Sequence, residues 1–249
     1  MKKSMMWNME NIDKFYVKDV TINRFECDLN SNLKVSSLLR QVEQISHEHS
    51  NAVGIDAAHH NRLHTAFLMT RVSVEIHQNI REEQKIRLVT RPYAPVRASY
   101  HRYNEAYDEN GGLLASVDSR WILIDTTSRR ITRRAPEGFD YPFLESPPKK
   151  HDSVEITPCE TQPCGSFLAA YSKVDLNGHL NNAEYADVIC DMVDTVKDRQ
   201  IRKMVIVYHN ELRLGETMNL HRGEIDNGYY CFGERENVRC FEANILFDV

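Results

Sequence analysis

The pattern of hydrophobic and polar residues divides the chain into helical and strand-like segments. Leu38, Val42, Ile45 and His49 recur every three or four residues, which predicts a helix with one buried face. Residues 67–76 then alternate between apolar and polar side chains and are rich in β-formers, as in a half-buried strand. We therefore expect a helix followed by strands in the first part of the chain.

Further strand-like runs follow in both parts of the chain. They cover residues 86–90, 98–107, 114–125, 204–208, 217–225, 229–236 and 239–247. The Asp-Glu-Asn-Gly-Gly segment at 108–112 separates two of these runs and predicts a hairpin turn. A helix followed by a meander of strands indicates an α+β fold in which the helix packs against an antiparallel sheet.

Two segments of the chain resemble each other at an offset of 147 residues, from Asp28 to Asp175. Asp28-Leu-Asn-Ser-Asn-Leu33 matches Asp175-Leu-Asn-Gly-His-Leu180 at four of six positions, and a helical pattern follows both. The pattern after the second segment consists of Tyr185, Ile189, Met192 and Val196. Short Asp/Asn-rich segments cap helices, but capping does not require the matching leucines. An internal repeat is therefore the better interpretation.

Prolines mark the boundary between the two repeats. Six of the eight prolines lie between residues 136 and 163, and proline removes backbone donors and favours extended structure. We expect residues 136–166 to be a connector that runs over a surface. It would join an N-terminal domain of residues 1–135 to a C-terminal domain of residues 167–249.

Composition excludes several classes of protein. The chain has 249 residues, 41% hydrophobic and 27% charged, a balance that excludes a disordered or collagen-like chain. The net charge of -5 argues against nucleic-acid binding, and no apolar run is long enough to span a membrane. The N-terminus lacks the apolar core of a secretory signal. We therefore expect a cytoplasmic protein with reduced cysteines.

The loop of the second repeat is the densest polar cluster with catalytic potential. Asp175, Asn177 and His179 lie on one face if the segment is extended, and Gly178 gives it freedom to turn. A carboxylate, an amide and an imidazole together suit the polarisation of a carbonyl and the positioning of a water. The alternative is a loop that only caps a helix, with His179 hydrogen-bonded and without a chemical role.

A comparison of the two repeats favours the chemical interpretation for the second one. The first repeat keeps the acid and the amide of the loop but has Asn32 where the second has His179. Glu211 stands in an apolar segment, where burial is costly unless a partner such as His179 is near. Glu75 is the parallel of Glu211 in the first repeat, at a different offset. We therefore expect the second repeat to be the catalytic one.

The segment Asp175–Tyr185 resembles the DxNxHxNNxxY signature of acyl–acyl carrier protein (ACP) thioesterases, the plastid and bacterial enzymes that end fatty-acid synthesis. Residues 121–130 are similar to the WxxxDxxTRR-like strand and turn of the same family. The resemblance implies a double hotdog, in which two tandem repeats each wrap a curved antiparallel sheet around a long helix. It also implies an acyl-chain pocket in the N-terminal hotdog.

The resemblance implies an active site of Asp175, Asn177, His179 and Glu211. Glu211 would activate the attacking water or attack directly, Asn177 and His179 would hold the carbonyl or the water, and Asp175 would orient the group. Many plant members have a cysteine after this glutamate, but Leu212 stands there in this chain and cannot form a thiolate. A cysteine mechanism is therefore disfavoured, and no cofactor or metal is implied.

Two other polar clusters have weaker chemical potential. Five histidines suggest a metal, but no acidic or cysteine ligand stands between the last two, which favours a solvated or lid-like loop. These histidines are His47, His49, His59, His60 and His64. A basic cluster before the connector is either a docking contact for the acidic ACP or a solvated turn. It consists of Arg129, Arg130, Arg133 and Arg134.

Together these features predict hydrolysis of fatty acyl-ACP to free fatty acid and ACP. The alternatives are an acyl-CoA thioesterase on the same fold, a non-catalytic acyl-binding module, and a hotdog hydratase or dehydratase. His179 together with Glu211 argues against a binding module, which needs neither, and the Asn181-Asn182 pair favours the thioesterase over the hydratase. A homodimer is possible, because two double-hotdog chains can still pair.

Overall fold

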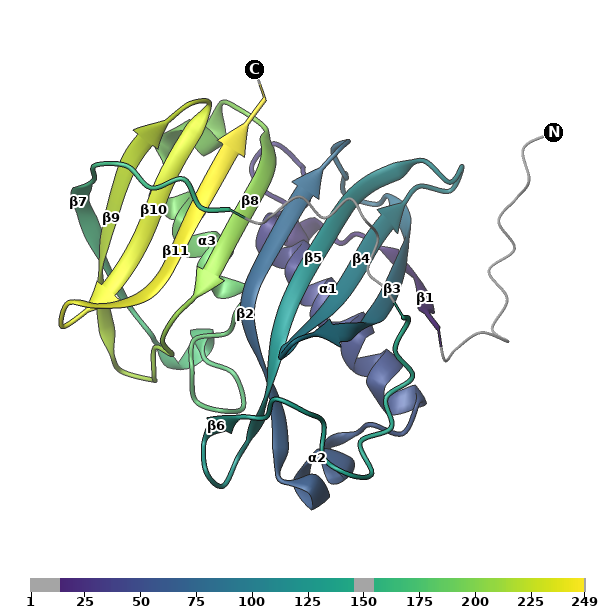
Figure 1. The fold of residues 1–249 in the computed structure, drawn as a ribbon. Helices are drawn as coiled ribbons and strands as arrows, with labels where there is room; N and C mark the ends of the chain where they lie inside the picture. Colours follow the sequence, from purple (N-terminus) through teal and green to yellow (C-terminus); the bar gives the residue numbers. More distant parts are fainter. Residues whose placement is uncertain (1–13, 146–154, 249) are drawn as a thin grey trace.

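The computed structural model describes residues 14–145 and 155–248 (Figure 1). The N-terminal half contains β1 (Tyr16–Thr21), the 3-10 helix η2 (Arg24–Glu26), α1 (Val35–Ala52), α2 (Ala57–Leu63), β2 (Thr65–Ile76), β3 (Lys85–Val96), β4 (Ser99–Tyr107), β5 (Leu113–Asp125) and β6 (Arg130–Ile131). The C-terminal half contains β7 (Gln162–Leu168), η3 (Tyr171–Lys173), α3 (Glu184–Asp191), η4 (Asp194–Lys197), β8 (Ile201–Tyr208), β9 (Thr217–Ile225), β10 (Gly228–Arg235) and β11 (Val238–Phe247). Each strand-like run predicted from the sequence falls in a strand, to within one residue at its ends.

The strands form one antiparallel sheet in the order β1-β3-β4-β5-β2-β8-β11-β10-β9-β7, with the short β6 paired to β5. β2 and β8 pair in the middle, with Val72 opposite Ile206 and Glu75 opposite Lys203. The strand order on one side of this pair repeats on the other, so the sheet consists of two equivalent halves. Figure 1 shows the two halves curving around α1 and α3. This arrangement is the α+β double hotdog expected from the sequence.

One hydrophobic core extends through both halves. The four residues of the predicted helical stripe are all buried on α1. The same cluster of buried side chains includes Ile189 from α3, Val72 from β2 and Phe241 from β11. Because the core is continuous beneath the β2–β8 pair, each repeat buries its apolar face against the other as well as against its own sheet.

The second helix is shorter than its sequence pattern indicates. α3 contains Tyr185 and Ile189 but ends at Asp191, so Met192 is its C-terminal cap and Val196 lies in η4. Met192 is nevertheless buried, which explains why the apolar pattern continues past the end of the helix. The expectation of two long helices is therefore wrong for the second repeat: α1 has 18 residues and α3 has 8.

The proline-rich connector does not simply run over a surface. Phe139 and Tyr141 are buried against the N-terminal half, and Leu144 forms a β-bridge with Tyr93 of β3. The end of the connector lies in β7, at the edge of the sheet, where a strand tolerates Pro163 because its outer side needs no ladder hydrogen bonds. The part with Pro147 and Pro148 lies outside the described residues.

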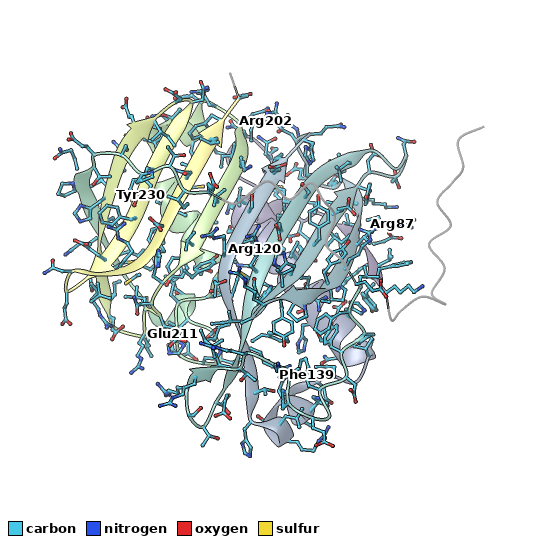
Figure 2. The ribbon with its side chains drawn as sticks, viewed as in Figure 1. Arg87, Arg120, Phe139, Arg202, Glu211 and Tyr230 are labelled. Atoms are coloured by element: carbon cyan, nitrogen blue, oxygen red, sulfur yellow. The ribbon has the colours of Figure 1, made fainter. Side chains whose placement is uncertain are left out.

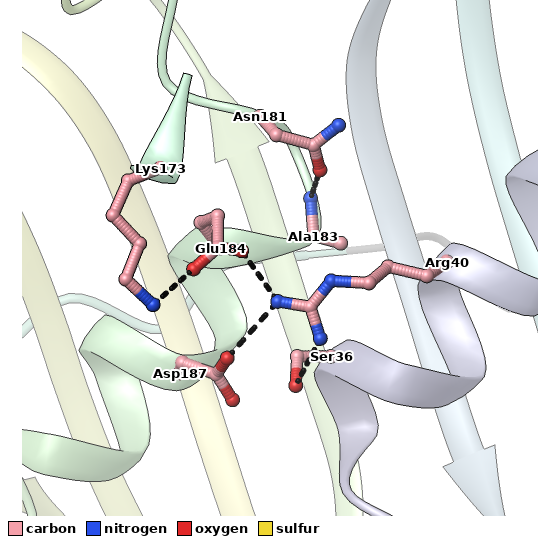
Figure 3. A network of polar contacts seen from close by, with 7 residues as sticks. All are labelled: Ser36, Arg40, Lys173, Asn181, Ala183, Glu184 and Asp187. Carbon is pink, nitrogen blue, oxygen red and sulfur yellow. Dashed lines mark hydrogen bonds and ion pairs between the residues drawn. The ribbon is translucent and has the colours of Figure 1, made fainter. Parts of the chain in front are cut away.

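A network of charges ties α1 to α3 (Figure 3). Arg40 Nη2 lies 2.5 Å from Glu184 Oε1 and 3.2 Å from Asp187 Oδ2, and Lys173 Nζ lies 2.8 Å from Glu184 Oε2. Arg40 and Asp187 occupy the same position of their repeats, at the offset of 147 residues. In a symmetric dimer of identical hotdogs this position would face its own copy, so opposite charges are possible only because the two repeats differ in sequence.

Candidate active site

The loop of the second repeat is a tight turn held by Asp175. Its Oδ1 accepts hydrogen bonds from the backbone N–H groups of Asn177 at 2.8 Å and His179 at 3.3 Å. The backbone of Asp175 also bonds to His179 O and to Gly178 N, and Gly178 has a φ of 76°, which glycine adopts without strain. The condition under which the three side chains would share one face, an extended segment, is therefore not met. A short Asx-type turn forms instead, because the carboxylate bonds the local backbone.

His179 and Glu211 meet at the surface of this turn. His179 Nε2 lies 3.2 Å from Glu211 Oε2, with 25% and 47% of the two side chains exposed. Glu211 follows β8, and this segment is bound to the loop by hydrogen bonds from Leu180 N to Leu212 O at 2.8 Å and from Leu214 N to Gly178 O at 2.9 Å. The two chain segments thus fix an imidazole and a carboxylate beside each other, within reach of water.

Asp175 and Asn177 contribute differently from this pair. Asn177 is exposed, and its side-chain amide donates to Asp175 Oδ2 at 3.1 Å. Asp175 therefore has both carboxylate oxygens engaged in the turn. This arrangement makes Asp175 the group that builds the loop, and it leaves the amide of Asn177 close to the surface.

The first repeat contains the same turn. Asp28 Oδ1 accepts from the backbone N–H groups of Asn30 at 2.8 Å and Asn32 at 2.9 Å. Leu33 N donates to Ile80 O at 2.8 Å, just as Leu180 N donates to Leu212 O. The repeat is therefore preserved in the hydrogen bonds of the backbone.

These hydrogen bonds also correct the match proposed for Glu211. Since Ile80 is the counterpart of Leu212, the residue that corresponds to Glu211 is Asn79. Glu75 lies within β2 and pairs with Lys203 at 2.9 Å, so the parallel between Glu75 and Glu211 is wrong. The first repeat has thus replaced both titratable groups of the pair with asparagine.

A pocket of about 340 Å³ lies in the N-terminal half. Its walls come from α1, α2, the sheet and the connector, and they are mostly aromatic and apolar. They include Phe67, Tyr100, Trp121, Tyr141 and Phe143. Glu43 of α1 also lines this pocket and accepts a hydrogen bond from Asn181, two residues after His179. Glu43 is therefore a residue of the pocket wall that contacts the second repeat.

Sequence reasoning did not single out Glu43 or the aromatic residues of the connector. Glu43 lies between Val42 and Ile45 of the apolar stripe as an ordinary helix carboxylate, and its contact with Asn181, 138 positions away, distinguishes it. Tyr141 and Phe143 lie in a proline-rich stretch, but two aromatic side chains in such a stretch are a usable signal of packing. Their rings stack at a centroid distance of 4.7 Å.

The histidines between residues 47 and 64 do not form a solvated loop. His59 and His60 lie on α2, where His59 is buried and both rings pack against Phe139. Burial lowers the pKa of His60, whose ring also packs against Phe67 at a pocket wall. In the part of the chain that the structure describes, no group of three or more histidine, cysteine, aspartate or glutamate residues is arranged to hold a metal ion.

The basic cluster surrounds the short strand β6. Its four arginines, Arg129, Arg130, Arg133 and Arg134, are all exposed. In Figure 1, β6 lies at the lower end of the molecule, and Figure 2 shows Glu211 and Phe139 at the same end. The cluster is therefore accessible at the end of the molecule that carries His179 and Glu211.

All six cysteines are free thiols. Burial raises the pKa of Cys190 and of Cys231 to about 12, so both are neutral thiols at ordinary pH. Leu212, at the position after the glutamate, is fully buried.

Comparison with known protein families shows to which family the chain belongs. The acyl-ACP thioesterase N-terminal domain matches residues 13–141, and the acyl-ACP thioesterase C-terminal domain matches residues 159–241. The chain belongs to the acyl-ACP thioesterase family. Membership confirms the resemblance seen at Asp175–Tyr185 and identifies the chain as a thioester hydrolase.

Solved structures agree with this acyl-ACP thioesterase fold. An acyl-ACP thioesterase from Bacteroides thetaiotaomicron VPI-5482 has 20% identity and a TM-score of 0.83, over 96% of this chain and 99% of that one. The 12:0-ACP thioesterase from Umbellularia californica has 13% identity and a TM-score of 0.83, over 94% of this chain and 97% of that one. A search of curated sequences gives no match. None of the described helices has the length and apolar character needed to cross a membrane.

Proposed function

We propose that this thioesterase hydrolyses fatty acyl-ACP at the His179–Glu211 pair and releases free fatty acid and ACP. The observation that carries the proposal is the contact of 3.2 Å between an imidazole and a carboxylate, in a chain that both acyl-ACP thioesterase domains match. The pair lies at the surface of a loop that also contacts the apolar pocket through Asn181 and Glu43. A base, a water-accessible surface and a site for an alkyl chain are therefore close together.

The chemistry follows from the position of each group. The His179 ring and the carboxylate of Glu211 lie 3.2 Å apart, so the pair can take a proton from water as it attacks the thioester carbonyl. Direct attack by Glu211 is the alternative, and its 47% exposed side chain allows either role. Asn177 would donate to the carbonyl or the water, while Asp175 would hold the turn that carries both residues.

The acyl chain would occupy the aromatic pocket of the N-terminal half. The pocket has a volume of about 340 Å³, and its wall surface is mostly apolar, as an alkyl chain requires. With the acyl chain in this pocket, the thioester would lie near Glu43 and the loop, and the carrier would remain outside. The size of the pocket would then limit the length of the acyl chain.

The four exposed arginines around β6 would bind the carrier. ACP is acidic in what the family implies, and opposite charges on two partners accelerate and orient their encounter. An acyl-CoA substrate would not need a protein-binding surface. A cytoplasmic location, a homodimer and the domain limits at residues 135 and 167 remain predictions from the sequence.

Thiol release from a panel of acyl-ACP and acyl-CoA substrates tests the function. His179→Ala and Glu211→Gln should each lower turnover by about two orders of magnitude or more, as expected for removal of a positioned acid or base. Release from CoA substrates alone would keep the chemistry but change the carrier. Near-normal turnover in both variants would contradict the site, and tight acyl binding without release by the native protein would indicate a binding module.

A further inference from the structure

Glu43 is the carboxylate that links the acyl pocket to the loop of the second repeat. It is half-buried on α1, lines the pocket of about 340 Å³ and accepts a hydrogen bond from the side chain of Asn181. Asn181 Oδ1 in turn accepts from Ala183 N at 2.8 Å (Figure 3), which points the amide nitrogen of Asn181 toward another partner. The position of Glu43 is therefore fixed from the opposite half of the molecule.

The internal repeat supplies a second, altered copy of this site for comparison. A cavity of about 630 Å³ is lined by the loop of the first repeat, by Asn79 and by Cys190 of α3. Cys190 corresponds to Glu43 at the offset of 147 residues. The loop of one repeat thus faces the helix of the other in both copies, and the altered copy contains the counterpart of each residue around the His179–Glu211 pair.

The differences between the copies separate two kinds of residue. Asp28 and Asn30, which correspond to the turn residues Asp175 and Asn177, are retained in the altered copy. His179, Glu211 and Glu43 are replaced in the altered copy by Asn32, Asn79 and Cys190, which are neutral at ordinary pH. Asn181 is also replaced, by Lys34. The aspartate that builds the turn is kept, whereas the imidazole of the loop and the carboxylates of Glu211 and Glu43 are all absent from the altered copy.

We propose that Glu43 is a third titratable residue of the active site and that its protonated carboxyl donates a hydrogen bond to the thioester carbonyl oxygen. The proposal rests on the function proposed above. A donor placed at this oxygen stabilises the negative charge that develops as water attacks, and an apolar pocket strengthens the interaction. A protonated carboxyl has one oxygen that can accept from Asn181 and a second that carries the proton.

The surroundings of Glu43 favour the protonated carboxyl. Burial and the negative charge of Asp175 raise its pKa to about 7, against the opposing effects of the Asn181 hydrogen bond and of Arg40 on the same helix. Tyr208 of β8 also faces Glu43, and burial keeps its phenol neutral by raising its pKa well above the usual value. A large part of the Glu43 population therefore carries a proton at neutral pH and loses it as the pH rises.

Substitution of Glu43 with matched variants tests the donor role. Glu43→Gln retains an N–H donor that does not ionise, so its kcat/KM should stay within about tenfold of the native value, and the decline above pH 7 should disappear. Glu43→Ala should lower kcat/KM by about 100-fold. Glu48 lies on the same helix but outside the pocket and pairs with Lys18, so Glu48→Gln should change neither kcat/KM nor its pH profile.

Several results would overturn the proposal. Native-like activity of Glu43→Ala would show that the carboxyl is dispensable. Equal loss in Glu43→Gln and Glu43→Ala would show that Glu43 acts as a base or nucleophile and not as a donor. An unchanged pH profile of Glu43→Gln would show that another group titrates.

A binding measurement distinguishes failure of this proposal from failure of the proposed function. The carboxyl of Glu43 can be titrated by NMR in protein labelled with ¹³C-glutamate, with Glu43→Gln identifying its signal. Binding of a non-hydrolysable acyl-pantetheine ketone, with a methylene in place of sulfur, should raise this pKa, because its carbonyl accepts from the protonated form only. An unchanged pKa in the complex would contradict the donor role even if the protein hydrolysed no substrate.

Discussion

Asp175 and Asp28 occupy the same position of the two repeats and accept the same pair of backbone N–H groups. A histidine, His179, stands four residues after Asp175, whereas Asn32 stands four residues after Asp28. Because Asp28 is retained in the repeat that lacks the histidine, the role shared by the two aspartates is to hold the turn. Asp175 therefore supports His179 by shaping the loop, and direct action on water is not needed to explain its presence.

Variants of the two aspartates test this division. Asp28→Ala and Asp175→Ala should each lower the free energy of unfolding by about 1–3 kcal/mol, since each leaves backbone donors without their partner. Only Asp175→Ala should also lower turnover. Asp175→Asn keeps an acceptor oxygen and should retain most of the activity. Loss of activity in Asp175→Asn as deep as in His179→Ala, in a thioester assay, would assign the carboxylate a chemical role.

At the level of elements, α1 and α3 interact through charges as well as through the core. Glu184 is buried at 8% exposure and depends on Arg40 and Lys173 for neutralisation. These two cations hold the pKa of Glu184 below its usual value despite burial. The interaction joins the long helix of one repeat to the short helix of the other, and Asn181 lies beside it (Figure 3).

Removal of one partner in this network should destabilise the protein. Arg40→Ala leaves a buried carboxylate with a single cation, and we expect it to lower the free energy of unfolding by about 2 kcal/mol. This loss is smaller than for a fully buried pair, because Arg40 is partly exposed. Arg87→Ala, which breaks the exposed Arg87–Asp19 pair labelled at Arg87 in Figure 2, should cost under about 1 kcal/mol. Urea unfolding measures the free energy of unfolding of both variants. Equal losses would show that the charge network does not stabilise the contact between α1 and α3.

At the level of the whole molecule, the connector forms part of the acyl pocket. Phe143 stacks on Tyr141 and packs against Tyr100 of β4, so the segment between the repeats closes a wall of the N-terminal half. Phe143→Ala should enlarge the pocket and shift the preferred acyl-ACP substrate to longer chains. Phe25→Ala, at a ring that is 79% exposed, is the control and should leave the preference unchanged. An unaltered chain-length profile of Phe143→Ala would place the acyl chain elsewhere.

The distribution of charge concerns the whole molecule as well. The net charge is -5, yet four arginines gather around β6 at the end that carries Glu211. Reversal of Arg129 and Arg130 to glutamate should raise KM for acyl-ACP by about tenfold at low salt, with kcat and the hydrolysis of acyl-pantetheine unchanged. Lys85→Glu, at an exposed position at the start of β3, controls for net charge. A KM that responds to neither charge reversal nor salt would exclude the cluster as the docking surface.

The sequence alone predicted the features that depend on local patterns. The apolar stripe of α1 and the alternation in the strands reflect periodicities of 3.6 and 2 residues, which burial of one face imposes on neighbouring residues. The repeat was also visible in the sequence, because Asp28 and Asp175 each bond a turn formed by the next four residues. The nearness of His179 to Glu211 was predicted from the resemblance to a known family and from the cost of burying a carboxylate. The second reason does not apply, because Glu211 follows β8 and is 47% exposed.

Only the tertiary structure decided the features that depend on contacts between distant segments. Asn79 replaces Glu75 as the counterpart of Glu211 because sheet pairing, and not sequence spacing, aligns the two copies. α3 ends at Asp191 although the apolar pattern continues, because Met192 and Val193 are buried in the core after the helix has ended. Glu43 acquires its neighbours only when α1 packs against the other repeat. Local patterns specify which face of a segment is buried, but the partner that buries it is fixed by the fold as a whole.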